Sequence, residues 1–398
     1  MNKNINKIAI IGAGASGLFS SILLSKKNHD VTIYEKNNKV GKKLLATGNG
    51  RCNISNENIN LNHFHSNSDI SYLKNIFKSF NYQKTKQFFS DIGIEFVNGA
   101  NGRVYPMSLM ASSVTDILEY EALKLGVKIQ LNHDVQSLSY SNNKFIIDGK
   151  DTFDKVIIAT GSLAMPKLGS CDSGYKFAQK FKHTIIPPFA SLVQLVSSNK
   201  NIDSISGVKI EAKVNGVVGD VLFTKYGLSG SAILDVSRKV SQKLQTQKNI
   251  QVSIDTMPHF PKERLISLLN DRAIKLGEKE IFLWLDGIMN KKLSRYIIIN
   301  SKISNSIKYA KFLNKKDILK IVHTIKNLEF NIIDTKGYET CEVCAGGVEL
   351  NQINLATMES KLQKNLYFLG EVLDIDGDCG GYNLQWAWSS SYNLANNI

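Results

Sequence analysis

The chain has 398 residues, of which 43% are hydrophobic, and it carries a formal net charge of +14. This length predicts more than one domain, or one domain with a large insertion, and this composition supplies a substantial core. Because no apolar stretch approaches the roughly 18 residues that cross a bilayer, and five cysteines are too few for a disulfide scaffold of this size, we expect a cytoplasmic protein with no membrane partner.

A glycine-rich turn follows the first apolar run of the chain. Residues 8–11 are apolar, Gly12, Gly14 and Gly17 come next, and a helical pattern starts at Leu18. This order predicts a strand, a tight turn and a helix, in which unpaired N–H groups at the helix start face a pyrophosphate. On its own, such a glycine pattern often marks only a tight turn.

Glu35 ends a second predicted strand, residues 31–34. A carboxylate at this position accepts hydrogen bonds from both hydroxyls of an adenosine ribose and repels a 2′-phosphate. We therefore expect a bound dinucleotide, FAD or NAD rather than NADP.

Three later segments favour FAD. Residues 156–161 predict a buried strand that ends in a small-residue turn beneath the cofactor, and residues 366–371 predict another that ends in a glycine and a carboxylate, placed to meet the ribityl chain. Gly380 and Gly381 then open a helix whose N–H groups face the flavin pyrimidine oxygen, which gains negative charge on reduction. The alternative is a C-terminal helix that only caps the sheet.

Separate motifs extend this pattern along the whole chain. They occupy residues 41–53, 102–106, 223–230, 346–348, 357–361 and 370–388. With them the chain resembles the BaiN/RdsA-like family (YhiN-type, also called aminoacetone-oxidase-type) of FAD-dependent oxidoreductases. The resemblance implies an α/β fold: a Rossmann-like FAD-binding domain of the GR2 type, with an inserted β-barrel and helical subdomain that forms one wall of the active-site cleft.

The expected FAD-binding residues come from the glycine turn, the second strand, the loop at 41–53 and the three later segments. They are Gly12, Gly14, Ala15, Ser16, Gly17, Glu35, Lys36, Lys43, Thr47, Gly48, Arg51, Thr160, Gly161, Gly370, Glu371, Gly380, Gly381, Tyr382 and Asn383.

The domain organisation is predicted to be discontinuous. Residues 1–188 and 338–398 form the FAD-binding domain, since Pro187 and Pro188 suit neither a helix nor a central strand and mark the exit. Residues 189–337 form the insert. Strand-like alternation and the hairpin turn Asn215-Gly216 predict a β-barrel part at 189–257, helical periodicity predicts a basic helical part at 258–330, and a return strand runs to 337.

The positive charge is concentrated in the insert. Residues 256–330 contain fifteen Lys and Arg but seven Asp and Glu. Such a surface can neutralise RNA phosphates, although a solvated lysine-rich surface caused by codon bias would have the same composition. The expected substrate or RNA contacts are Arg103, Lys291, Lys292, Arg295, Lys308, Lys311, Lys315 and Lys316.

The sequence offers fewer candidate catalytic residues than candidate binding residues. Cys52 is a candidate proton donor, since a neutral thiol can protonate carbon, but it can equally fill space beneath the pyrophosphate. Tyr382 and Asn383 are candidate ring contacts or substrate orienters. Cys341 and Cys344 have the spacing of a zinc or redox pair, yet no second pair accompanies them. The resemblance implies that they lie in a strand returning to the FAD-binding domain, where small residues pack, and we expect no metal site.

The resemblance implies three chemistries, all of which use flavin N5 as hydride donor or acceptor: reduction of uridine to dihydrouridine in ribosomal RNA, oxidation of small amines, and reduction of unsaturated steroid acids. Our leading hypothesis is the RNA reductase. Since no second glycine fingerprint is present, NAD(P)H would dock transiently in the substrate cleft as reductant. The alternatives are an oxygen-dependent small-amine oxidase and a flavin-stabilised, non-catalytic RNA-binding or ribosome-assembly factor. The oligomeric state does not follow from the sequence.

Overall fold

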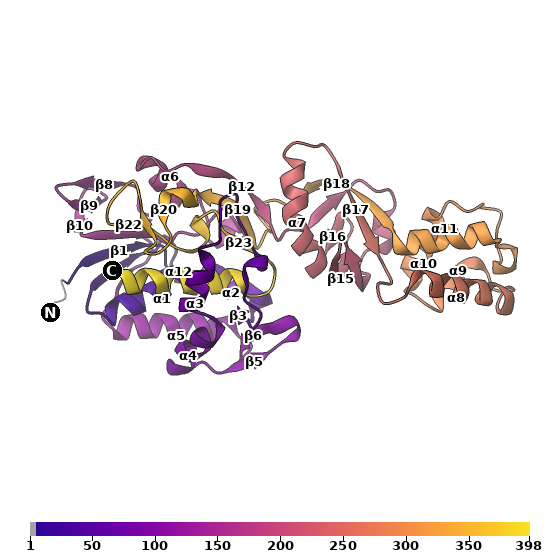
Figure 1. The fold of residues 1–398 in the computed structure, drawn as a ribbon, viewed down its shortest axis with the longest axis horizontal. Helices are drawn as coiled ribbons and strands as arrows, with labels where there is room; N and C mark the ends of the chain where they lie inside the picture. The colour runs from indigo at the N-terminus through magenta and orange to yellow at the C-terminus, as the bar shows by residue number, and fades with distance from the viewer. Residues whose placement is uncertain (1–4) are drawn as a thin grey trace. The chain divides into compact units, whose positions relative to one another are not determined.

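The computed structural model describes residues 5–398 and divides the chain into two compact units. Unit 1 combines the residues up to Ser191 with Tyr338–Ile398, and unit 2 is Leu192–Gly337. Figure 1 shows the course of the chain through both. Each unit has its own hydrophobic core.

A seven-stranded sheet forms the centre of unit 1. Its order is β20-β21-β22-β11-β1-β2-β7, and the pairs from β22 to β7 are parallel. The strands are β1 (Lys7–Ile11), β2 (Asp30–Tyr34), β7 (Lys128–Gln130), β11 (Lys155–Ile158), β20 (Ile353–Asn354), β21 (Glu359–Ser360) and β22 (Leu366–Phe368). Apolar side chains of β1 and β11 are buried on both faces of the sheet, as expected for central parallel strands.

Helices and small sheets cover the two faces of this sheet (Figure 1). The helices α1 (Ala15–Ser25), α5 (Ala111–Lys124) and α12 (Tyr382–Asn397) lie on one face, where α1 packs on both others. An antiparallel sheet, β10-β9-β8, lies on the other face. Its strands are β8 (Leu138–Ser141), β9 (Lys144–Ile147) and β10 (Asp151–Phe153), and the remaining helices of unit 1 are α2 (Lys42–Gly50), α3 (Leu73–Ser79), α4 (Tyr82–Asp91) and α6 (Ser173–Lys180).

Short antiparallel pairs connect distant parts of unit 1. The pairs are β3 (Ser55–Asn56) and β5 (Phe96–Asn98) with β6 (Arg103–Pro106), β4 (Phe64–His65) with β23 (Asp376–Gly377), and β12 (Ile185–Ser191) with β19 (Val343–Val348). Pro187 and Pro188, expected to suit neither a helix nor a central strand, lie within β12, which belongs to a two-stranded sheet. The register shifts between Ile186 and Phe189, and this irregularity accommodates the prolines in a two-stranded sheet.

Unit 2 contains a closed barrel and a helical part. The barrel order is β13-β16-β15-β14-β17-β18. Its strands are β13 (Leu195–Ser197), β14 (Lys209–Val214), β15 (Val217–Phe223), β16 (Gly227–Ser229), β17 (Ile250–Asp255) and β18 (Leu328–Thr335), and its helices are α7 (Ser231–Leu244), α8 (Lys262–Lys275), α9 (Ile281–Asp286), α10 (Lys291–Asn300) and α11 (Lys315–Lys326). The predicted hairpin is confirmed: Asn215 and Gly216 both have positive φ between β14 and β15.

Phe330 connects the barrel to the helical part of unit 2. Its ring is fully buried, lies 6.1 Å from that of Tyr296 on α10 in a stacked arrangement, and lies 5.8 Å from that of Phe223 on β15. We predict that Phe330→Ala lowers the free energy of unfolding of unit 2 by about 3–5 kcal/mol, measured by urea denaturation. The control Phe312→Ala, where the ring is 61% exposed, should stay within about 0.5 kcal/mol of wild type. Equal losses for both variants would contradict this packing.

Candidate functional site

The glycine turn of unit 1 brings a strand and a helix into close contact. Gly12 has φ +107°, and a Cβ there would lie 2.5 Å from the carbonyl oxygen of Ala159. A Cβ on Gly17 would lie 1.9 Å from the carbonyl oxygen of Gly12. Gly14 is different, because open space surrounds it and no side chain caps α1. The first N–H groups of α1 therefore remain for an anionic ligand, which fits a pyrophosphate.

Glu35 lies at the end of β2 and is 7% exposed. Its Oε2 accepts a hydrogen bond from the Ala13 N–H at 2.8 Å, and its Oε1 accepts two from Asn37 at 2.8 and 2.7 Å. A carboxylate has about four lone-pair sites, so one remains for a ribose hydroxyl. Lys36 and Thr160 line the same open recess. The recess fits the adenosine end of a dinucleotide.

Lys43 and Glu371 form an ion pair where α2 meets the end of β22. Lys43 Nζ lies 2.6 Å from Glu371 Oε2, while Glu371 Oε1 accepts hydrogen bonds from Ser162 Oγ at 2.8 Å and the Cys344 N–H at 3.1 Å. Burial disfavours the ammonium, but the Glu371 carboxylate outweighs it, so the pKa of Lys43 is raised. Because Glu371 is engaged by protein donors on both oxygens, contact with a ribityl chain stays a prediction.

The loop at 41–53 contains a sharp kink. Thr47, Gly48 and Asn49 depart from helical geometry, and Gly48 has φ +57°. Arg51 lies over the ring of Tyr105 at 5.1 Å and donates from Nε to the Gly48 carbonyl at 3.2 Å. This cation–π contact and hydrogen bond hold the loop, and no contact with a phosphate is needed to explain the position of Arg51.

Cys52 is fully buried beneath that kink. Burial raises the pKa of its thiol to about 12. A thiol with this pKa is a weak acid at neutral pH, and it has no surface through which to reach a substrate. The structure therefore favours the space-filling role over the proton donor expected as one alternative from the sequence.

The start of α12 is built from the glycine pair. Gly381 has φ +97°, and a Cβ there would lie 2.3 Å from the Ser55 carbonyl oxygen. No side chain caps the helix. Asn56 Nδ2 donates to the Gly380 carbonyl at 2.9 Å, which fixes the loop before the helix. The start of α12 thus resembles that of α1 in having no side-chain cap.

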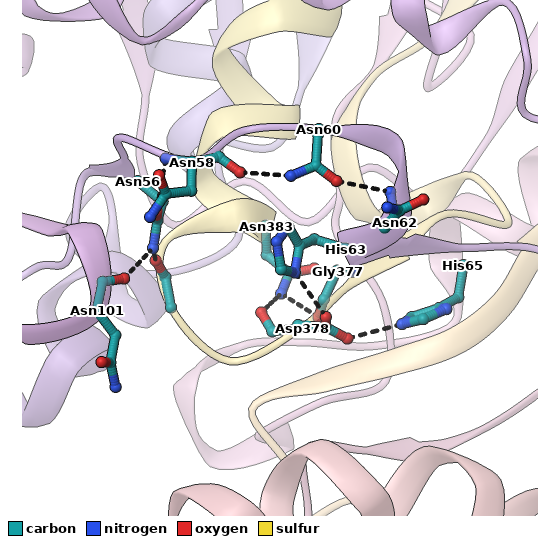
Figure 2. Close-up of polar contacts among 11 residues, drawn as sticks. Asn56, Asn58, Asn60, Asn62, His63, His65, Asn101, Gly377, Asp378 and Asn383 are labelled. Atoms are coloured by element: carbon teal, nitrogen blue, oxygen red, sulfur yellow. Dashed lines mark hydrogen bonds and ion pairs between the residues drawn. The ribbon is translucent and has the colours of Figure 1, made fainter. Parts of the chain in front are cut away.

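Asn383 has a structural partner. Its Oδ1 accepts from the Gly377 N–H and its Nδ2 donates to the Gly377 carbonyl, both at 2.8 Å (Figure 2). The side chain therefore joins β23 to α12, and its role as a ring contact or substrate orienter stays a prediction. Tyr382 is 5% exposed, and its ring lies 4.3 Å from the ring of His63, at an interplanar angle of 18°.

His63, His65 and Asp378 form a cluster that the sequence did not predict (Figure 2). His63 Nδ1 lies 3.0 Å from Asp378 Oδ2, and His65 Nε2 lies 2.7 Å from Asp378 Oδ1. All three side chains are about 30% exposed: 31%, 30% and 27% in that order. Burial opposes ionisation of Asp378, but hydrogen bonds from His65 and His63 outweigh it and lower its pKa.

The pairing of β4 with β23 produces this cluster, with His65 opposite Asp376 and Phe64 opposite Gly377. Two histidines two residues apart, and an aspartate just before a glycine pair, were the available sequence signals. Neither indicates the other, since more than 300 residues separate them.

Arg103 reaches the same loop. One guanidinium nitrogen, Nη2, lies 3.9 Å from Cys379 Sγ, next to Asp378. A contact of Arg103 with substrate or RNA stays a prediction. Cys341 and Cys344, by contrast, are buried at the start of β19.

The expected RNA contacts of the insert lie in the helical part of unit 2. Lys291, Lys292, Arg295, Lys308, Lys311, Lys315 and Lys316 are all exposed. Lys291 and Lys292 begin α10, and Lys315 and Lys316 begin α11. Positive charge at a helix N-terminus opposes the helix dipole, so these four side chains do not serve helix stability.

Comparison with known proteins identifies the family. The model of the HI0933-like protein Rossmann domain matches residues 6–397. The chain belongs to the HI0933-like family. It is 35% identical to the 3-dehydro-bile acid delta(4,6)-reductase of Clostridium scindens, covering 98% of each chain, and 32% identical to the ribosomal RNA dihydrouridine synthase of Haemophilus influenzae, covering 98% of this chain and 97% of that one. The family and its relatives confirm the resemblance inferred from the motifs.

A relative in Escherichia coli, also named ribosomal RNA dihydrouridine synthase, is 30% identical and is covered to 97%. Among solved structures, the 3-ketosteroid delta1-dehydrogenase of Sterolibacterium denitrificans aligns with a TM-score of 0.51, 10% identity and 99% coverage of both chains, which shows likeness of fold. The protein is therefore an FAD-dependent oxidoreductase with a Rossmann-like fold. Within residues 5–398, no helix is long and apolar enough to cross a membrane.

We predict that Glu35→Gln weakens FAD binding. An amide neither carries the charge nor accepts all three hydrogen bonds, and a hydrogen bond to a charged group contributes about 1.5–3 kcal/mol, so the Kd should rise about tenfold to a hundredfold. The matched control is Asp30→Asn at the opposite end of β2, where the carboxylate pairs with Lys128. FAD titration of the apoprotein measures both. Equal FAD affinity of the Glu35 variant and wild type would contradict a contact between Glu35 and FAD.

Proposed function

We propose that this protein reduces a C=C bond, with the uracil base of a uridine in ribosomal RNA as substrate and dihydrouridine as product. The relatives named ribosomal RNA dihydrouridine synthase and bile acid reductase support C=C reduction. The observation that favours RNA among these substrates is the exposed basic side chains of α10 and α11, which a steroid acid does not require.

Different residues of unit 1 bind different parts of FAD. The open start of α1 holds the pyrophosphate, Glu35 accepts a ribose hydroxyl, and the start of α12 offers N–H groups to the flavin pyrimidine oxygen. FAD supplies the hydride of the reaction when bound. The target base must leave its stack to reach the ring, and cationic side chains of unit 2 hold the surrounding phosphates.

NAD(P)H is the proposed electron source. A separate NAD(P)H-binding domain would need a second parallel sheet with its own glycine turn. Among residues 5–398, only one sheet has consecutive parallel strands, and we assign the glycine turn after its strand β1 to FAD. A nicotinamide therefore docks transiently in the substrate site. Such shared use of one site gives ping-pong kinetics.

A second candidate is reduction of an unsaturated steroid acid, because the relative named as a bile acid reductase is 35% identical over the full chain. Binding of a steroid acid requires an apolar pocket for its ring system. An assay with 3-oxo bile acids that contain a conjugated double bond separates the two candidates.

Deletion of the gene tests the proposed substrate. We expect loss of dihydrouridine at one position in ribosomal RNA, measured by mass-spectrometric mapping, and its return on complementation with the wild-type gene. An unchanged map would contradict the RNA substrate and leave the steroid acid, the small amine and the non-catalytic RNA-binding role.

The basic residues of α11 give a second test. Replacing Lys315 and Lys316 with Gln should weaken binding to ribosomal RNA and reduce the slope of log K against log salt by about one to two, since each phosphate contact contributes about 0.7–0.9. The control replaces Lys74 and Lys78, exposed on α3 of unit 1, and removes the same charge. Equal slopes for both variants would contradict a specific role for α11.

A further inference from the structure

Reduction of a C=C bond needs a proton as well as a hydride. The hydride adds to one carbon, the π bond breaks, and the other carbon takes a proton from an acid. The Cys52 thiol is fully buried, so the acid has to lie elsewhere. The cluster of His63, His65 and Asp378 is the strongest candidate among the described residues of unit 1.

The two imidazoles present different nitrogens to one carboxylate. His63 uses Nδ1, which leaves its Nε2 directed away from Asp378, whereas His65 uses Nε2. An ionised carboxylate only accepts hydrogen bonds, so both facing nitrogens carry their hydrogens. This arrangement fixes the tautomer of each ring, and a proton that His63 gives up leaves from Nε2.

The ring of His63 also contacts the first residue of α12. Its ring stacks on Tyr382, the first residue of the helix that follows the glycine pair, at 4.3 Å. It keeps 31% of its side chain exposed, so a substrate and the solvent can both reach it. His65 lies on the strand β4, opposite Asp376.

We propose that His63 is the catalytic acid of the reaction, and that Asp378 and His65 are positioning residues that orient it. This inference rests on the proposed function. His63 in its imidazolium form passes the Nε2 proton to the carbon next to the one that receives the hydride. The substrate gains one hydride and one proton, His63 becomes neutral, and solvent returns the proton.

Two substitutions of His63 separate proton donation from structure. His63→Asn retains an amide at the place of Nδ1, so it preserves the hydrogen bond to Asp378. His63→Phe retains a ring to stack on Tyr382. Neither variant has a proton to give. His65→Gln keeps a donor at the place of Nε2, and His259→Gln, an exposed histidine paired with Glu211 in unit 2, is the control.

The experiment mixes FAD-loaded, prereduced full-length protein with unmodified ribosomal RNA from the deletion strain, without oxygen. We expect the rate of flavin reoxidation to fall about 10²-fold to 10⁴-fold in both His63 variants, because neither side chain can supply the proton. His65→Gln should lose less, and His259→Gln should match wild type.

A second readout does not depend on activity. Nitrogen chemical shifts of the histidine rings in the apoprotein should show neutral His63 protonated at Nδ1 and neutral His65 at Nε2. Asp378→Asn should remove both preferences, because an amide can donate to a ring nitrogen as well as accept from it.

The outcomes distinguish the inference from the function on which it rests. If wild type forms dihydrouridine and both His63 variants react at its rate, His63 is not the acid, although the proposed function stands. If wild type leaves the RNA unchanged, the proposed function fails and this role fails with it. Ring shifts that show the opposite tautomers would overturn the positioning by Asp378.

Discussion

The close approach of α1 to β1 is the constraint on which the site depends. A side chain at Gly17 would collide with the Gly12 carbonyl oxygen, and one at Gly12 would collide with Ala159 on the neighbouring chain segment. Only glycine allows this packing, so the start of α1 lies directly at the ends of β1 and β11. The same turn supplies the Ala13 N–H that orients Glu35. Two features that we expect to bind the dinucleotide thus follow from one steric requirement.

The C-terminal segment completes unit 1 from more than 300 residues away. Ser391 Oγ on α12 donates to the Ser16 carbonyl at 3.1 Å, and Trp388 Nε1 donates to the Ile54 carbonyl, just before β3, at 2.9 Å. These buried contacts place α12 against α1, and the glycine pair at its start beside β3 and β4. The two uncapped helix starts, one at α1 and one at α12, are therefore held in a single core.

Sequence patterns were sufficient to predict features whose backbone geometry is determined by neighbouring residues in the chain. The glycine turn and the Asn215-Gly216 hairpin were predicted because their backbone conformations select particular residue types. Roles that depend on tertiary pairing were not predictable. The hydrogen bonds by which Asn383 joins β23 to α12 depend on tertiary structure, and His63 gained its partner only through the pairing of β4 with β23. Burial of Cys52 likewise depends on a kink in α2 that propensity does not reveal.

The central claim is that the flavin ring lies at the start of α12, beside His63, with the pyrophosphate at α1. A crystal structure of the FAD-loaded protein tests it most directly. The account predicts phosphate oxygens in hydrogen-bond contact with the first N–H groups of α1 and the isoalloxazine ring in contact with residues 380–382 and His63. An isoalloxazine ring bound away from the start of α12, or an α1 start closed by protein side chains, would contradict it.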